Sequence, residues 1–487
     1  MRVKRTLLVL VGTAMVLACV GAGAALWALD RAGIMPRSLG PYVERRSEGH
    51  NPLIEAVGRW AGHWLRAQDR ATPELAPLPA LPVALPMTLP KHSADSPAGA
   101  TVLAGSSAEV VAAIARAEPG DTITLLPGTY RFTDKINVAR PGRAGMPVTV
   151  RAIDAGSVLI EFDTTEGFKV SAPYWRFENL SLRGTCSEDS YCEHAFHVVG
   201  AAHHFVSLNN TIFDFNAHFK INGENQVFPD SGLIEGTVLS NSHVRRTVNP
   251  VTPIDLVAAS GWTVRRNVIT DFIKTDGNRV SYGAFFKGGG SGNVFEQNTV
   301  LCEHRLRGNP GQSIGLSLGG GGTGKDFCRD RRCVTEQDQG VIRANLIASC
   351  SDVGIYLNSA ADSKLTHNTL VDTGGIDVRF PASSATLEGN LIDGPIRGRD
   401  GGLVRENDNR STPPAYAYLG YHPLRSLFRA PAEFDFSWQG GPAAAPRRAG
   451  AATAAPADLC AATRAAPPAY GAFEDFAACL RAPNTGR

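Results

Sequence analysis

Short apolar segments with a period of two recur through the middle of the chain. In each segment one residue separates two hydrophobic residues, which is the spacing of a β-strand that buries one face. We expect all of these pairs to point into one core: Phe196/Val198, Phe219/Ile221, Ile254/Leu256, Ala284/Phe286, Leu316/Leu318, Ile355/Leu357 and Ile376/Val378.

An asparagine followed by small and hydrophobic residues recurs with a similar period. The copies are Asn179, Asn210, Asn241, Asn267, Asn298, Asn345, Asn368 and Asn390, at intervals of 31, 31, 26, 31, 47, 23 and 22 residues. Such intervals fit the coils of a solenoid, in which stacked Asn side chains form amide ladders at a strand spacing of about 4.8 Å. The repeat predicts an all-β fold, a single-stranded right-handed parallel β-helix over residues 100–408. An antiparallel sandwich is the rival, but hairpin dipeptides do not occur at the spacing it needs.

The residues between the inward pairs should form two columns on the outer face of one sheet. We expect the first column to be His197, Lys220, Asp255, Phe285, Ser317, Tyr356, Asp377 and Arg397. The neighbouring column should be Val199, Asn222, Val257, Lys287, Gly319, Asn358, Arg379 and Arg399.

The two ends of the chain have a different character. Residues 6–29 carry no charge and follow a basic start, so they predict a transmembrane helix or a cleaved signal, with everything after Asp30 outside the cytoplasm. Residues 31–99 contain an amphipathic helix over 51–69 and a Pro-rich linker, and a helix opened by Ser106 or Ser107 should cap the solenoid. Residues 409–487 are expected to form a C-terminal cap and an Ala/Pro-rich tail. The protein is therefore expected to be anchored in the inner membrane and face the periplasm, or to be secreted or periplasmic if the signal is cleaved.

The cysteines agree with an exported protein. Eight of the nine lie outside the apolar segment, and they predict four disulfides. Cys186/Cys192 and Cys328/Cys333 would close short loops, Cys460/Cys479 would staple the tail, and Cys302 and Cys350 are left to pair. The net charge of +2 gives no argument for nucleic acid, and no CxxC indicates zinc.

The outward columns are unusually rich in side chains that can bind or react. His197, Lys220, Asn222, Asp255, Lys287, Tyr356, Asn358, Asp377 and Arg379 share one face, and His304, Arg305 and Arg307 follow in a loop. This set predicts binding of an anionic polysaccharide, because Arg and Lys can meet repeated anions along a strip. The plain alternative is a solvated sheet surface.

The same residues allow two cleavage chemistries to be compared. For β-elimination from a uronate, Lys287 would be the base, Arg305, Arg307 or Arg379 would neutralise the carboxylate, and Tyr356 or Tyr282 would donate the proton. For hydrolysis, Asp255 and Asp377 lie four coils apart, about 19 Å, and are too distant to act as a pair. A partner for Asp255 among Asp271, Asp276 and Asp352 stays open.

Two stretches resemble the chondroitinase-B and alginate-lyase-like group of pectin-lyase-like β-helix proteins. The stretch over residues 119–130, PGDTITLLPGTY, resembles their entry strand. FKGGGSGNVFEQNT at 286–299 resembles their Lys-bearing strand and Asn turn, which implies a catalytic role for Lys287. The following strand has Ser317-Leu-Gly-Gly-Gly where the group has an Arg-His-Gly setting, and the group's calcium-binding Glu residues are replaced by Arg279-Val-Ser-Tyr282.

A few further residues bear on cofactor and reaction. Asn249, Asp255, Asp276 and Asn278 offer oxygen ligands for Ca²⁺. Thr252-Pro-Ile-Asp255 is similar to the Asp-Pro-His-Asp motif of mannuronan epimerases, without its His. The sequence thus favours a polysaccharide lyase-like enzyme. The alternatives are a non-catalytic carbohydrate-binding or envelope-structural β-helix, a uronan epimerase and a glycoside hydrolase.

Overall fold

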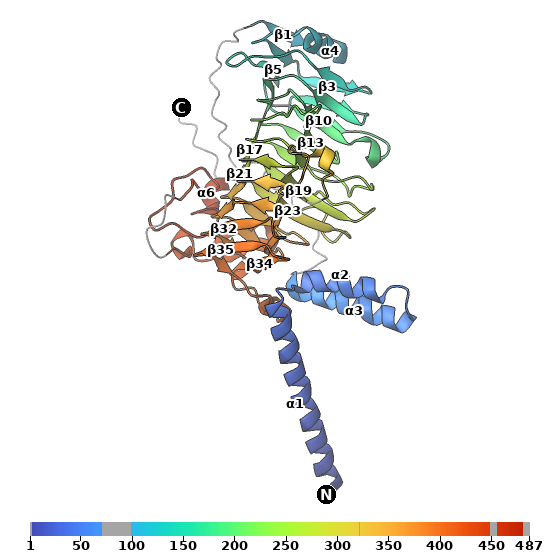
Figure 1. Cartoon of the computed structure of the whole chain (residues 1–487), viewed down its shortest axis with the longest axis vertical. Coiled ribbons are helices and arrows are strands. Elements are labelled where there is room, and N and C mark those ends of the chain that lie inside the picture. The colour runs from blue at the N-terminus through green and yellow to red at the C-terminus, as the bar shows by residue number, and fades with distance from the viewer. Residues whose placement is uncertain (1, 71–98, 321, 449–454, 481–487) are drawn as a thin grey trace.

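Three long parallel sheets wind around one core in a computed structural model that describes residues 2–70, 99–320, 322–448 and 455–480 (Figure 1). Successive strands go to successive sheets, so that strands in neighbouring coils pair in parallel. The chain is therefore a parallel β-helix, as the Asn and apolar repeats predicted. The expected Pro-rich linker lies almost wholly outside the described residues.

The sheets have 12, 11 and 10 strands. The twelve-stranded sheet contains β1 (Thr101–Ala104), β2 (Thr122–Leu125), β5 (Val148–Ala152), β8 (Trp175–Glu178), β11 (Val206–Leu208), β14 (Leu233–Glu235), β17 (Thr263–Arg265), β21 (Val294–Glu296), β25 (Val341–Arg343), β29 (Ser363–Thr366), β32 (Ser384–Glu388) and β35 (Leu403–Asn407). The eleven-stranded sheet contains β3 (Gly128–Phe132), β6 (Val158–Phe162), β9 (Ser181–Gly184), β12 (Thr211–Phe213), β15 (Val238–Ser240), β18 (Val268–Thr270), β22 (Thr299–Leu301), β26 (Leu346–Ala348), β30 (Thr369–Val371), β33 (Leu391–Ile392) and β36 (Arg410–Ser411). The ten-stranded sheet contains β4 (Ile136–Val138), β7 (Glu166–Val170), β10 (His194–Val199), β13 (Ala217–Asn222), β16 (Ile254–Val257), β19 (Val280–Lys287), β23 (Gln312–Leu318), β27 (Ile355–Asn358), β31 (Ile376–Arg379) and β34 (Ile396–Arg399).

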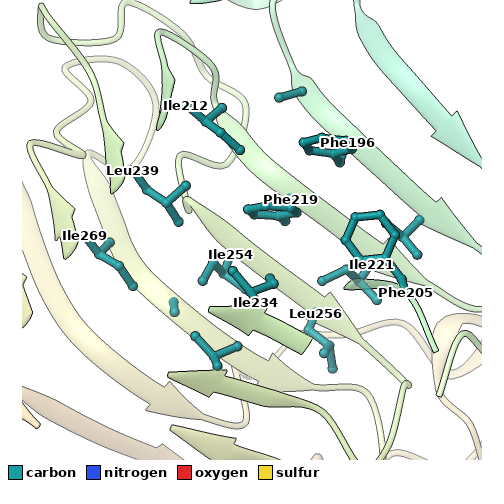
Figure 2. Packing of buried hydrophobic residues seen from close by; sticks show 14 of the residues in the cluster. Phe196, Phe205, Ile212, Phe219, Ile221, Ile234, Leu239, Ile254, Leu256 and Ile269 are labelled. Carbon is teal, nitrogen blue, oxygen red and sulfur yellow. The ribbon is translucent and has the colours of Figure 1, made fainter. Parts of the chain in front are cut away.

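The ten-stranded sheet has the predicted register. Phe196 pairs with Phe219, which pairs with Ile254, and the match continues through every predicted inward pair to Ile376 and Val378. All of these side chains are fully buried, and Figure 2 shows several of them stacked from coil to coil. Both outward columns follow from the same register, including the positions of Arg397 and Arg399.

The amide ladder occupies the turn between the twelve- and eleven-stranded sheets. Each rung donates its side-chain N–H to the Oδ1 of the next, through Asn267, Asn298, Asn345, Asn368, Asn390 and Asn409. The prediction was wrong for two members. Asn179 lies one position earlier in the turn, where φ is 60°, and Asn241 lies in a different turn, after β15. Asn409 was missed.

Two kinds of segment cover the solenoid. Helix α4 (Ser107–Arg116), capped by Ser106 as expected, buries Val110 and Ile114 at the N-terminal end. The part of the C-terminal segment that contains the antiparallel strands β37 (Phe428–Ala430) and β38 (Asp435–Trp438) and helix α6 (Phe476–Leu480) does not close the other end as expected. It packs against outward apolar residues of the eleven-stranded sheet, Leu301, Leu346, Ala348 and Val371, at the side of the solenoid (Figure 1).

The last coil instead meets the N-terminal helices α1 (Arg2–Arg31), α2 (Pro36–Ser47) and α3 (Pro52–Asp69). Gly33 accepts a hydrogen bond from Arg397 of β34 through its backbone oxygen, and the backbone N–H of Ala415 in α5 (Pro414–Tyr418) donates to Asp30. Within α1, residues 12–31 have a mean hydropathy of 1.8, and that apolar stretch is not buried in the protein. The helix is long and apolar enough to serve as an anchor or a signal.

All four predicted disulfides are present. They join Cys186 to Cys192, Cys302 to Cys350, Cys328 to Cys333 and Cys460 to Cys479. Cys302 and Cys350 lie in equivalent turns of successive coils, and their Cα atoms are 4.9 Å apart. Disulfides of this number agree with an extracytoplasmic protein.

Candidate functional site

The N-terminal half of the outward columns forms a continuous row of polar contacts. His197 Nδ1 lies 2.7 Å from Glu166 Oε1, and its Nε2 lies 2.8 Å from Asn222 Oδ1. The hydrogen bond from His197 is the main reason why the pKa of Glu166 falls to about 2. One strand further, Lys220 Nζ donates to Asp255 Oδ2 at 2.7 Å.

Asp255 is the buried anion of this row. Burial alone would raise the pKa of its carboxyl group, but the charges of Lys220 and Lys287 outweigh burial and leave the pKa below its ordinary value. Its second oxygen, Oδ1, has no hydrogen-bond partner among the described residues. This oxygen is itself buried, so it is not presented to a ligand on the outer face of the sheet.

Lys287 ends β19 in the second outward column. Its ammonium lies 4.2 Å from the centre of the Phe285 ring. Burial lowers the pKa of Lys287, Lys220 acts in the same direction, and Asp255 and Glu336 oppose them, so that the net shift is downward. A lysine in this environment releases its proton more easily than an exposed one and meets the first requirement of a general base.

Two titratable groups beside this row were not predicted. The imidazole of His194 lies 5.3 Å from that of His197, and burial lowers its pKa to about 4. Burial also raises the pKa of Glu193, whose Oε1 accepts a hydrogen bond from Asn249. Both stand at the start of β10, where the inward–outward alternation is not yet established, so the period of two gave no signal for them.

A second group of predicted residues lies further along the sheet. The Tyr356 hydroxyl accepts hydrogen bonds from Arg379 at 3.4 Å and from Asn358 at 3.3 Å. By strand register Asn358 is two strands from Lys287, or about 10 Å. Between them lie Gly319 and Gly320: the Glu336 side chain lies beside Gly319, and the Lys287 chain leans over Gly320. Glycine at these two positions lets Glu336 and Lys287 pack closely against the backbone.

Two predicted site residues have structural contacts instead. Asp377 is buried and held by Arg397 and by Arg399, at 2.6 Å from the latter, so its charge is already balanced. Arg307 stacks on Phe434 and donates to the backbone oxygen of Ala432, which ties the C-terminal segment to the coil. These contacts leave Asp377 and Arg307 poorly suited to bind a substrate.

The structure does not bring Arg305 to Lys287. Arg305 lies in the loop that precedes β23, and its backbone N–H donates to Asp271 Oδ1 together with those of His304 and Leu306. This loop stands at the start of the strands, whereas Lys287 stands at the end of β19, about 23 Å away along a strand of this length. Tyr282, near the start of β19, is also remote, and burial raises its pKa.

The expected calcium ligands do not form an open donor set. The Asn249 side chain donates to Glu193, Asp255 is paired with Lys220, and Asn278 accepts from the backbone of Val280. Among the described residues, no group of three His, Cys, Asp or Glu side chains is placed to hold a metal ion. Three of the four predicted calcium ligands thus already have other partners, and a role for Ca²⁺ stays a prediction.

Comparison with known proteins returns mainly polysaccharide lyases. No family model matches the sequence. Pectate lyase L of Dickeya chrysanthemi is 29% identical over 119 residues, which are 22% of this chain and 26% of that enzyme, so the chain spans about a quarter of this relative.

Solved structures give the same kind of likeness at low similarity. An alginate lyase from Paenibacillus sp. has 14% identity and a TM-score of 0.36 over 64% of this chain and 99% of that one. A rhamnogalacturonan lyase has 12% identity and a TM-score of 0.43 over 64% of this chain and 87% of that one. A lacto-N-biosidase from Eubacterium ramulus has 11% identity and a TM-score of 0.43 over 63% of this chain and 64% of that one. We therefore assign the fold of this chain from its own strand pairing and not from these similar structures.

Proposed function

We propose that this right-handed β-helix is an extracytoplasmic, membrane-tethered polysaccharide lyase-like enzyme that binds an anionic polysaccharide along its ten-stranded sheet. The observation that carries the proposal is Lys287: a partly buried lysine with a lowered pKa, in an outward column of the ten-stranded sheet beside Asp255 and Lys220. The lyase character of the relative agrees with it.

The proposed reaction is β-elimination from a uronate. Neutral Lys287 takes the proton from C5, the electron pair forms the C4–C5 double bond, and the C4–O bond to the next sugar breaks. The leaving oxygen takes a proton from Tyr356, whose hydroxyl is held by Arg379 and Asn358. Arg379 and Lys220, which pair with Asp400 and Asp255 in the free protein, would turn to the substrate carboxylates, and His197 and Asn222 extend the binding row.

Hydrolysis is the second candidate, and a specific observation favours it. Glu193 has a raised pKa and Asp255 a lowered one, which is the division of roles between a general acid and an ionised carboxylate. By register their Cα atoms lie about 16 Å apart, so both side chains would have to reach toward one bond.

The test incubates the full chain with alginate, pectate and other polyuronates while ultraviolet absorbance from new C4–C5 double bonds is recorded. Lys287→Ala should lower turnover by about 10²–10⁴-fold. Lys287→Arg keeps the charge but cannot supply a neutral amine, so it should be as inactive as Lys287→Ala. The matched control is Lys169→Ala, an outward lysine of the same sheet at β7, which should keep turnover.

Other outcomes separate the alternatives. Full activity in Lys287→Arg would show that only the charge of this lysine matters, and full activity in Lys287→Ala would remove it from the mechanism. New reducing ends without absorbance, abolished by Glu193→Gln, would favour hydrolysis. Retention on immobilised polyuronate without any product would make the protein a binding module. A chelator tests the calcium prediction: turnover that requires Ca²⁺ would be lost when the chelator is added and restored when excess Ca²⁺ is added.

A further inference from the structure

Helix α3 has an apolar face that is exposed. Leu53, Ile54, Val57, Trp60 and Trp64 have exposed fractions of 73%, 51%, 56%, 68% and 46%. At 100° per residue these five side chains lie within a strip about 120° wide. Scattered exposed hydrophobic residues need no explanation, but a strip with two tryptophans on one helix indicates a partner.

This apolar strip is not used to hold the hairpin of α2 and α3 together. The two helices approach through glycines: a Cβ at Gly58 would lie 2.0 Å from Ser47 Oγ, and one at Gly62 would lie 2.4 Å from Glu44 Oε1. Small residues that let helices approach closely, with large apolar side chains left outside, are the arrangement of helices whose surroundings are lipid.

The hairpin is also fixed to the solenoid. Arg37 at the start of α2 pairs with Asp69 at the end of α3 at 2.6 Å, with both side chains buried, and donates to the backbone oxygen of Cys350. Arg70 pairs with Glu303 at 3.1 Å. Because these contacts hold the base of the hairpin, the apolar strip keeps one direction relative to the β-helix.

The apolar strip faces the side of the protein on which α1 leaves it. The Asp30 and Gly33 contacts hold the end of α1 under the last coil, and only four residues separate α1 from α2. Figure 1 shows α1 leaving the solenoid and the hairpin extending sideways from the same end, with α3 on the side away from the sheets. A membrane that contained α1 would therefore begin at the level of α3.

We propose that the apolar strip of α3 lies in the outer leaflet of the lipid bilayer that α1 enters. This inference rests on the membrane-tethered location in the proposed function, but not on its chemistry. Arg59 on α3, with an exposed side chain, and the exposed Arg45 and Arg46 at the end of α2 would meet anionic headgroups. The single helix α1 leaves rotation and tilt free, and the second contact removes that freedom.

The consequence is a fixed height for the candidate site. β19 is four strands from β34 in the ten-stranded sheet, so Lys287 would stand about 19 Å above the last coil. The row from Lys287 to Glu166 runs further from the membrane. A polysaccharide would thus be met above the bilayer surface rather than at it.

The test measures the depth of spin labels in the full chain, reconstituted at one copy per nanodisc of phosphatidylcholine with some phosphatidylglycerol. A Cys19→Ser background leaves the disulfides as the remaining cysteines. Labels at Val57→Cys and Trp60→Cys should collide severalfold more with oxygen than with an aqueous nickel complex. The matched control Arg59→Cys, on another side of the same helix, should show the reverse.

Labels at 57 and 60 that behave like the label at 59 would overturn the proposal, because the strip would then lie in water. Strong dipolar coupling between labels at a higher copy number, with nickel access at one copy per disc, would overturn it in favour of a second chain. A chain that does not enter nanodiscs would overturn the tethered location itself. Turnover measured on the same samples reports on the proposed function independently.

Discussion

The amide ladder makes a prediction about stability that can be worked out from its hydrogen bonds. Asn345 stands in the middle of the ladder, fully buried. Its Oδ1 accepts from the backbone and side-chain N–H groups of Asn298, both at 2.9 Å. Its Nδ2 donates to Asn368 Oδ1 and to the backbone oxygen of Phe295, both at 3.0 Å.

Asn345→Ala should cost much more than the loss of one hydrogen bond. The substitution leaves the Asn298 backbone N–H and the Phe295 carbonyl buried without these partners, and each such group costs about 1–3 kcal/mol. We therefore expect a loss of about 4 kcal/mol in the free energy of unfolding. Asn409→Ala, at the last and partly exposed rung, should cost about 1 kcal/mol, because water replaces the lost contacts.

The measurement is hydrogen exchange by mass spectrometry, because solenoids unfold coil by coil and one melting temperature does not describe them. In Asn345→Ala, exchange should rise in peptides that cover β21 and β25 and stay unchanged in β2 and β5. In Asn409→Ala, only β32, β35 and their turn should exchange faster. Equal effects of the two substitutions would refute the reasoning, since a ladder rung would then be worth the same in the core and at the edge.

Two further substitutions have matched controls. Burial lowers the pKa of His218 to about 4, so the unfolded chain binds a proton between pH 6.5 and 4 that the folded chain does not. This one group should lower the free energy of unfolding by about 3 kcal/mol across this window and not above it, in addition to the similar effects of His194 and His367. Denaturant titrations should show a smaller fall for His218→Gln, and an unchanged fall for the exposed His63→Gln. Arg37→Ala leaves Asp69 buried without its main partner and should release the α2–α3 hairpin to protease at a cost of about 3–5 kcal/mol. Cleavage no faster than in Arg59→Ala, which removes an exposed pair, would contradict this.

The strand register was predictable because a period of two permits only two choices for each strand. Phe196, Phe219 and Ile254 fix the inward choice, and every outward residue between them follows. The turns were less predictable, because coil length varies and an Asn is favoured in more than one turn. Asn241 shows this: it belongs to the turn after β15, while Thr237 takes the ladder position in its coil.

The candidate site shows the same difference between strand residues, which were predictable, and loop residues, which were not. Lys220, Asp255 and Lys287 were correctly placed on one face because they lie inside strands. Arg305 and Arg307 lie in a loop, whose path depends on contacts with Asp271 and with the C-terminal segment that no periodicity encodes. Loop residues were therefore assigned to the site from their charge alone, and the structure places them elsewhere.

The three outer faces differ in whether their side chains are already satisfied. On the twelve-stranded sheet, Glu235, Arg265, Glu296 and Arg343 alternate in charge from strand to strand and pair with one another. On the eleven-stranded sheet, the outward apolar residues are covered by the C-terminal segment.

The ten-stranded sheet carries a partly buried lysine that has no ion pair. Among the described residues, no carboxylate lies within ion-pair distance of Lys287, whose ammonium lies over the Phe285 ring. Unsatisfied charge on a partly buried surface costs free energy in the isolated protein, and a ligand that completes the contacts recovers it. An anionic group bound beside Lys287 would thus stabilise this face of the ten-stranded sheet.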